Sequence, residues 1–298
     1  MSRAPGIRAL WRSGLERLRG FGRPIGLAWL TGAALALPAS VPVYEAFDRA
    51  LGRSRYAPLA TQGFDLDWFM DFKSGAGATL ASMNTPLLLA AAVAMLLSVF
   101  FAGGVLGLLR DPVRPVRISL FLHHGATHFG RFLRLFLMAG LAYAAVFWFV
   151  RIRLSERLEE SLTWLPSDVA VLTLRLVLTA VVLWLMAWIH MAQDLARLAA
   201  VVHGRRDMVA GFFRGLVDAV RNFEVLAGLY LWALVGWAVL TVAYLVLAWL
   251  AGGVPGAWGS AVLLTLAQLY MLARTWVGFG LTASLLAWYE GEGSGAGG

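Results

Sequence analysis

Two histidines one helical turn apart come nearest in this sequence to metal chemistry. His124 and His128 are four positions apart, a spacing that places both imidazoles on one face of a helix, where they can ligate one metal ion. No Asp or Glu lies between them to act as a third ligand or as a base, and Gly125 interrupts the stretch. An interfacial helix explains the pair better. We therefore predict no metal site and keep His124 and His128 as weak candidates.

A third histidine raises haem or pigment binding. His190 ends an apolar stretch that also contains Trp184 and Trp188, and a neutral imidazole there can ligate haem iron or chlorophyll magnesium. Antenna polypeptides usually place a small residue one turn before such a histidine, whereas this chain has Met186. An ordinary interfacial histidine is therefore the favoured interpretation of His190. No cofactor is predicted, and a pigment or haem ligand is the alternative.

Three charged residues accompany the apolar stretches. Arg274 lies near the middle of the last one, where a lipid-facing arginine is unfavourable by about 2.5–3.5 kcal/mol on insertion scales. We expect Arg274 to face the bundle interior, or to contact a lipid or a partner, unless a shifted helix lets its guanidinium snorkel inward. Glu224 is predicted to pair with Arg221 or, if the last helix is displaced, with Arg274. Arg175 is predicted to snorkel toward outer acids. These acids are Glu159, Glu160 and Asp168.

Residues typical of an active site are not gathered in one place. The chain has no cysteine, which excludes disulfides, thiolate catalysis and cysteine-ligated metals. The histidines are predicted on one side of the membrane and many of the acids on the other, so the cluster that a membrane enzyme requires is missing and no catalytic activity is expected. The pI near 10.5 is explained by arginines at helix ends facing anionic lipid, so nucleic acid is not an expected partner.

Composition requires these residues to be carried by membrane helices. The 298 residues are 60% hydrophobic and only 14% charged, which leaves too little polar surface to solvate a globule. Six stretches are apolar over the length of about 20 residues that one helical crossing needs. They are approximately residues 25–44, 85–109, 133–150, 169–190, 223–251 and 258–288. The sequence therefore predicts an all-α, polytopic membrane bundle of about six transmembrane helices.

The distribution of arginine predicts the orientation. Sixteen arginines lie in residues 1–24, 110–134 and 191–222, whereas the intervening polar segments hold only seven basic residues. Because basic residues near helix ends stay on the cytoplasmic side, both termini are expected in the cytoplasm. The expected location is the bacterial inner membrane.

The same polar segments suggest an internal repeat. Each resembles an amphipathic helix that ends at an arginine, namely Arg23, Arg131 or Arg221. Gly125 and Gly215 both precede their arginine by six residues, whereas the first copy lacks that glycine. We predict three helix-hairpin units within one membrane domain, over residues 1–110, 111–204 and 205–290, and a flexible glycine-rich tail over 291–298. The alternative is that any polytopic protein has such helix ends.

Small residues indicate where helices approach closely. Gly103, Gly104 and Gly107 occupy the end of the second apolar stretch, and small residues at such spacing allow helix backbones to come together. We therefore predict helix packing at these three glycines.

Three segments carry a resemblance. They are the run 101–107 that leads into a basic loop, the segment 119–137, and the exit Asp194-Leu195-Ala196-Arg197 from the fourth crossing. In these segments the chain resembles a broad group of uncharacterised bacterial six-helix membrane proteins, which includes the membrane domain attached to some glycerophosphodiester phosphodiesterases. The resemblance covers most of the chain and implies only a fold, because nothing in this sequence corresponds to a phosphodiesterase domain.

Three classes of function remain to be compared. A transporter should place several polar groups near the midplane, but Arg274 has only Gln268 and Thr265 as weak company. A membrane enzyme should gather His, Asp or Glu residues on one surface, and the sequence predicts no such cluster. We therefore expect a non-catalytic accessory or scaffold subunit that packs against other integral membrane proteins, for which a bioenergetic complex would suit the tryptophan-rich chain. The alternative is a transporter or lipid-handling protein that uses a buried Arg274. Membrane lipids are expected partners in either case.

Overall fold

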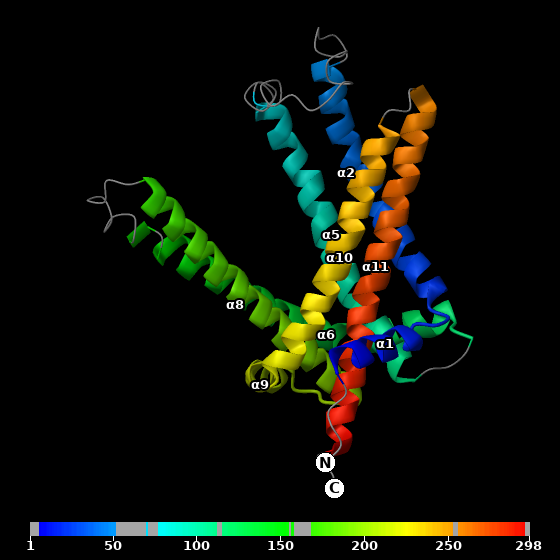
Figure 1. Ribbon diagram of the computed structural model, residues 1–298, viewed down its shortest axis with the longest axis vertical. Coiled ribbons are helices and arrows are strands. Elements are labelled where there is room, and N and C mark those ends of the chain that lie inside the picture. The colour runs from blue at the N-terminus through cyan, green and yellow to red at the C-terminus, as the bar shows by residue number, and fades with distance from the viewer. Residues whose placement is uncertain are drawn as a thin grey trace. The chain divides into compact units, whose positions relative to one another are not determined.

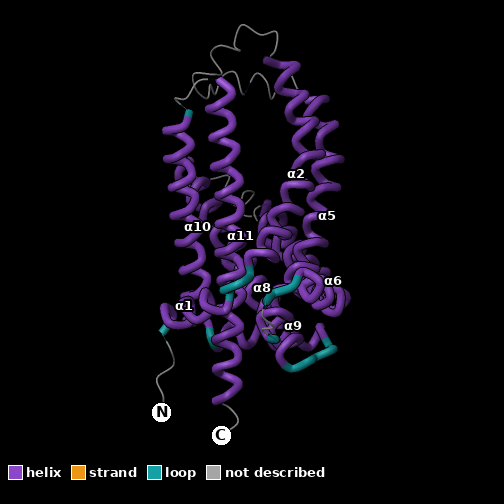
Figure 2. The backbone as a smooth tube through the Cα atoms, turned by 90° about the vertical axis from the view of Figure 1, so that its right-hand side faces the viewer, coloured by secondary structure: helices purple, strands orange, loops and turns teal. Residues whose placement is uncertain are grey.

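The computed structural model describes residues 6–51, 70, 77–111, 115–154, 156–157, 168–252 and 256–295. Within these ranges the chain is helical apart from short turns (Figures 1 and 2). The elements in chain order are α1 (Ile7–Arg17), α2 (Gly22–Leu51), α5 (Gly77–Arg110), α6 (Ile118–Val146), the π-helix η1 (Phe147–Leu154), α8 (Asp168–Val202), α9 (Met208–Arg221), α10 (Phe223–Ala251) and α11 (Gly256–Gly295).

Five helical stretches of the described residues are long and apolar enough to cross a membrane. They are Thr85–Arg110, Ile118–Leu154, Val171–Val202, Phe223–Ala251 and Trp258–Gly291. Large apolar side chains are exposed along them, and lipid solvates such surfaces where water would not. The chain is therefore an all-α, multi-pass membrane protein, as predicted. The remaining predicted crossing, residues 25–44, lies in the 30-residue helix α2, which contains Pro38 and Pro42.

The described helices belong to two compact units. Gly26–Ser98 forms the smaller unit, which holds most of α2 and the first part of α5. Met1–Ile25 and Val99–Gly298 form the larger unit. All contacts described below lie within the larger unit.

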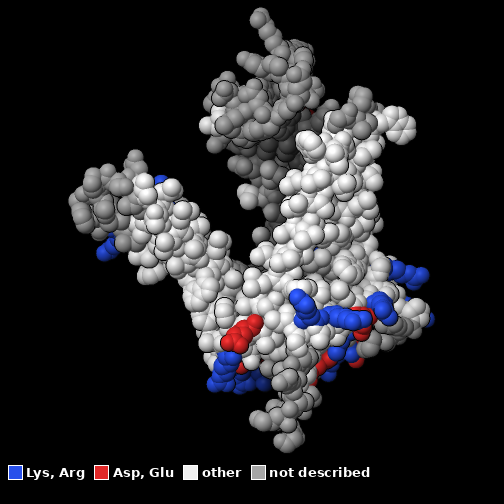
Figure 3. Space-filling view, in the orientation of Figure 1, with Lys and Arg blue, Asp and Glu red and all other residues white. Residues whose placement is uncertain are grey.

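Most charged residues in the view of Figure 3 gather at one end of the larger unit, over α1 and α9, and a few basic ones lie at the far tip of the α8 arm, whereas α10 and α11 are nearly free of them. This end is called the charged end. The helix α9 has one small-residue face, with Gly211, Gly215 and Ala219 buried, and exposes Arg214 and Arg221 on the rest of its surface. Helices of this pattern lie in the headgroup region of a membrane. The predicted amphipathic helices are present as α1 and α9, and their location at the membrane surface stays a prediction.

Glycines let both of these short helices lie against a long helix. A Cβ atom added at Gly14 of α1 would be 2.7 Å from the backbone nitrogen of Ser284 in α11. One added at Gly215 of α9 would be 3.2 Å from the carbonyl carbon of Ala192 in α8. Backbones can approach this closely only where a side chain is missing. Gly14 is therefore the packing glycine of the first predicted repeat, although it does not stand six residues before Arg23 as the sequence pattern required.

The beginning of α6 packs on the end of α5 in the same way. A Cβ atom at Gly104 of α5 would be 2.7 Å from the ring of Phe121, and one at Gly125 of α6 would be 2.8 Å from the ring of Phe100. At this crossing a glycine of each helix thus lies against an aromatic ring of the other helix. Both glycines are buried, so this crossing is part of the core.

These three crossings follow a cyclic order. The beginning of α6 packs on α5 and α9 packs on α8, so each lies against the long helix that precedes it in the chain. The first surface helix, α1, packs on the last long helix, α11. The threefold repeat itself stays a prediction.

Two features differ from the expected units. The second unit has no separate surface helix, because α6 runs unbroken from Ile118 to Val146, whereas Gly20 with a φ of 94° separates α1 from α2. The tail expected to be flexible from residue 291 is helical to Gly295. Glycine lowers helix propensity without forbidding a helix.

Candidate functional site: a polar centre beside an apolar groove

Helices α5, α8 and α11 meet in the core of the larger unit, near its charged end. A cavity of about 30 Å³ lies between them. Its walls are Ala102 and Leu106 of α5, Asp194, Arg197 and Leu198 of α8, and Thr282 and Leu285 of α11. A single water molecule takes up about 30 Å³ in the liquid. The cavity is therefore too small for a solute.

Asp194 is the centre of a polar cluster at this cavity. Its Oδ1 accepts a hydrogen bond of 2.9 Å from Arg197 Nη1, and its Oδ2 accepts one of 2.5 Å from the Tyr230 hydroxyl of α10. The Nε2 atom of His190 lies 3.7 Å from the same Oδ2. Because the Asp194 and Arg197 side chains are only 20% and 15% exposed, these bonds compensate the cost of burying both charges.

Helix periodicity explains why these groups meet. His190, Asp194 and Arg197 are spaced four and three residues apart, so all three lie on one face of α8. The Arg197 guanidinium carbon lies 6.0 Å from the ring centre of Phe132 in α6, a favourable cation–π position. The cluster thus joins α6, α8 and α10.

An arginine also closes the end of α8. Arg110, the last residue of α5, donates a hydrogen bond through Nη1 to the carbonyl oxygen of Val201. The last carbonyl groups of a helix have no partner within the helix, and a cation there also interacts favourably with the helix dipole. The basic end of α5 is therefore part of the core packing.

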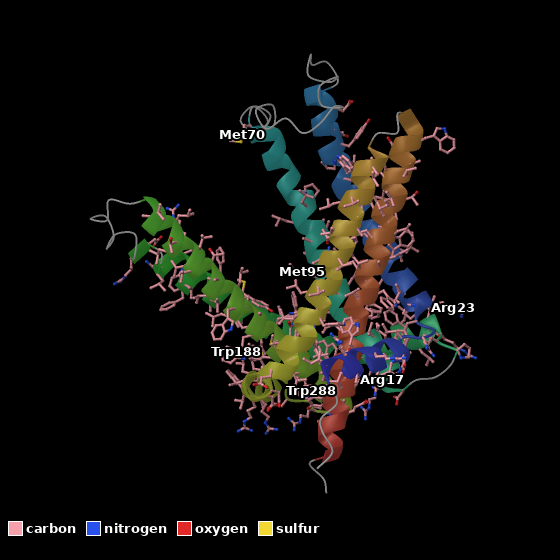
Figure 4. All side chains as sticks on the ribbon, in the orientation of Figure 1. Arg17, Arg23, Met70, Met95, Trp188 and Trp288 are labelled. Atoms are coloured by element: carbon pink, nitrogen blue, oxygen red, sulfur yellow. The ribbon has the colours of Figure 1, made fainter. Side chains whose placement is uncertain are left out.

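An apolar groove lies beside the polar cluster, between α8 and α10, which diverge away from the charged end (Figure 1). Its volume is about 360 Å³. It is lined by Trp184, Ala187, Trp188 and Met191 of α8 and by Phe223, Ala227, Tyr230, Leu231, Leu234 and Trp237 of α10. Figure 4 labels Trp188 on α8, and its ring centre is 5.0 Å from that of Trp184. The groove therefore has a strongly aromatic lining.

His190 is part of the polar cluster. Its ring makes an edge contact with Tyr230 at 5.9 Å between centroids, and its Nε2 atom faces the Asp194 carboxylate. An ordinary histidine at position 190, with a pigment or haem ligand as the alternative, stays a prediction.

The histidine pair is a packing element. A Cβ atom at Gly107 of α5 would be 2.5 Å from the Cβ of His124, and one at Gly103 would be 3.1 Å from the Cβ of His128. His124 and His128 thus lie on the face of α6 that contacts the α5 glycines. In the part of the chain that the structure describes, no group of three or more His, Asp or Glu residues is placed to hold a metal ion.

Arg274 is exposed on the larger unit and is not enclosed by it. Its side chain has no hydrogen-bond or ion-pair partner among the described residues. The expectation of an enclosed arginine is not met, since the Arg274 side chain is exposed. The backbone carbonyl of Arg274 accepts a hydrogen bond of 3.4 Å from Trp237 Nε1, which places Arg274 next to the groove.

Glu224 is not the counter-charge of Arg274. It is exposed at the start of α10 and makes no ion pair with Arg221 within the described residues. Trp237, thirteen residues further along α10, is the residue level with Arg274, so about 20 Å of helix rise separates the two charges. The pairing of Glu224 with Arg274 is therefore wrong.

Arg175 is exposed near the start of α8. Glu159 and Glu160, two of its predicted partners, lie outside the described residues. Its predicted contact with these acids stays a prediction.

Sequence reasoning missed the Asp194 cluster. The segment 194–197 marks the exit of a crossing in the sequence, and two charges in an apolar helix, preceded by a histidine one turn earlier, are also a signal of a buried polar site. Tyr230 gave no such signal, because one tyrosine in an apolar stretch is common at interfaces. Comparison with known proteins adds no relative, since no family model, curated protein or solved structure matches the chain.

Proposed function

We propose that this protein is a non-catalytic accessory subunit of a bacterial inner-membrane complex, and that a transmembrane helix of a partner protein docks in the groove between α8 and α10. The charged end faces the cytoplasm in this proposal, as the arginine distribution predicts. The groove is the observation that carries the proposal.

The lining of the groove suits a protein partner. Trp184, Trp188 and Trp237 offer broad rigid surfaces, and tryptophan is enriched among the residues that dominate binding energy at protein interfaces. Ala187 and Ala227 are small residues of the two walls, and small residues let a further helix approach closely.

Contacts of the polar cluster hold the two walls of the groove in place before a partner helix binds. The Tyr230–Asp194 hydrogen bond joins α10 to α8 at the charged end, and α9 packs on α8 directly before the chain enters α10. Both walls are therefore held before a partner arrives, which reduces the ordering cost of binding.

The transporter alternative has less support. The polar cavity at Asp194 is only about 30 Å³, whereas ligand sites usually measure about 300–1,000 Å³; the groove reaches about 360 Å³, but its lining is almost entirely apolar. Arg274, on which that alternative depends, is exposed and not buried in the bundle.

Gentle extraction followed by native mass measurement tests the proposal. The parent chain should carry a membrane protein partner in a fixed ratio. Ala227→Trp fills the groove and should release that partner, whereas Leu264→Trp, at a 63% exposed position of α11 outside the groove, should keep it. A parent chain that runs alone, or an Ala227→Trp variant that retains its partner, overturns the proposal.

A further inference from the structure

The packing of α1 on α11 indicates how deep in the membrane Arg274 lies. A Cβ atom at Gly280 of α11 would be 3.1 Å from Leu15 of α1, and Gly14 lies against Ser284. Because a basic amphipathic helix lies in the headgroup region, this part of α11 marks the membrane boundary at the charged end. Arg274 precedes Gly280 by six residues, so it lies about 9 Å deeper in the membrane by helix rise. It therefore lies within the hydrocarbon, closer to one boundary than the sequence suggested.

Arg274 also has a defined direction. Residues 274, 281 and 285 are spaced by seven and four positions and share one face of α11. Leu281 is 6% exposed, and Leu285 lines the cavity together with Asp194 of α8. The guanidinium therefore extends from the face of α11 that is directed toward α8. Trp237, which lines the groove, donates a hydrogen bond to the Arg274 carbonyl, so the backbone of Arg274 adjoins the end of the groove away from the charged end.

An ionised guanidinium at this place needs a counter-charge. An arginine in hydrocarbon is unfavourable by several kcal/mol unless it is paired or hydrated. The charged residues described on the neighbouring helices do not meet this need: Arg197 and Asp194 of α8 pair with one another, and Glu224 of α10 is about 20 Å away along the helix. The groove lining offers no counter-charge, so a helix that occupies the groove is the candidate to supply one.

We propose that the partner helix in the groove carries an Asp or Glu at the depth of Arg274, and that this carboxylate binds the guanidinium. A carboxylate accepts two parallel hydrogen bonds from an arginine fork. Pairing on docking neutralises both charges at once, so it fixes the depth of the partner helix as well as its identity. This inference rests on the proposed function and adds the chemistry of the partner.

Substitutions of Arg274 test the ion pair in the intact complex. Arg274→Leu should lower the fraction of chain that carries the partner in native mass spectra by about tenfold or more, because a buried carboxylate is left unpaired. Arg274→Lys should retain an intermediate fraction, since an ammonium keeps the charge without the fork. Arg175→Leu removes the other arginine of an apolar stretch and should keep the partner. If the Arg274→Leu variant keeps its partner, the proposed ion pair between Arg274 and a partner carboxylate is overturned.

A photo-crosslinking residue at Leu231, a groove position that is 59% exposed, makes the test independent of how well the Arg274 variants fold. The captured transmembrane segment should contain an Asp or Glu. A captured segment without an acid, or capture of phospholipid alone, overturns the inference. If Ala227→Trp releases the partner and Arg274→Leu does not, groove docking stands and the ion pair fails. If neither variant releases the partner, the proposed docking site itself fails.

Discussion

The Tyr230 hydroxyl of α10 donates a hydrogen bond of 2.5 Å to the Asp194 carboxylate of α8. This contact joins the two walls of the groove where they are closest to the charged end. Asp194 is also held by Arg197 of its own helix. The Tyr230–Asp194 bond therefore fixes α10 relative to α8, together with the packing of α9 on α8.

Removing that hydroxyl should loosen the groove. Tyr230→Phe leaves one carboxylate oxygen without its donor, and we expect a loss of about 1–3 kcal/mol in the free energy of unfolding. Asp194→Asn should reduce the effect of Tyr230→Phe, because the two groups form one interaction. Thermal unfolding of the four proteins of this double-mutant cycle in detergent measures the coupling. Tyr244→Phe is the matched control, since the Tyr244 ring stacks on Tyr270 at 5.0 Å. Equal losses from Tyr230→Phe and Tyr244→Phe would contradict the role of the hydroxyl.

The crossing of α5 and α6 should not tolerate a single methyl group. Gly104→Ala brings its Cβ to 2.8 Å from the carbonyl oxygen of Phe121, so the two backbones must separate, at a cost of about 1–3 kcal/mol. Gly130→Ala on α6 is the control, because a Cβ there meets no atom within 4 Å. In a helix that change usually stabilises, by up to about 1 kcal/mol. Melting temperatures in detergent should fall for Gly104→Ala and hold or rise for Gly130→Ala; the opposite order would exclude close packing at Gly104.

Close packing should hold α1 in place more strongly than its ion pair does. Arg17 Nη1 lies 2.8 Å from Glu290 Oε2, with side chains 34% and 35% exposed, so Arg17→Ala should cost at most about 1 kcal/mol. Gly14→Ala should cost more, because its Cβ would be 2.7 Å from the Ser284 backbone nitrogen. The labelling rate of a cysteine at Leu10, which is 5% exposed, reports the release of α1. Faster labelling in Arg17→Ala than in Gly14→Ala would reverse this ranking.

The orientation of the chain has a direct test, because the protein contains no cysteine. A cysteine at Trp258, 80% exposed at the start of α11, should react with an impermeant maleimide added to intact cells. A cysteine at Ser119, exposed at the charged end of α6, should react only after the cells are opened. Labelling of Ser119→Cys alone in intact cells would place the charged end outside.

The class of protein follows from the sequence alone. Runs of apolar residues as long as 223–251 and 258–288 have only one stable form in lipid, in which the backbone bonds within its own helix. Helices α10 and α11 accordingly cover these ranges. The glycines at 103, 104 and 107 also indicated a close approach in the sequence, because a missing side chain has few other uses in an apolar helix.

The pairing of helices is decided only by the tertiary structure. Helical period places His190, Asp194 and Arg197 on one face of α8, but it does not say which helix that face meets. Tyr230 completes the cluster from α10, 36 residues after Asp194, and no local pattern connects the two. Arg274 shows the same limit: its sequence context predicts a cost in lipid, whereas its exposure and its contact with Trp237 come from the packing of α11 on α10. Hydrophobicity is a property of each segment by itself and so determines that a helix spans the membrane. The rotation of a helix and its neighbours depend on how several surfaces fit together at once.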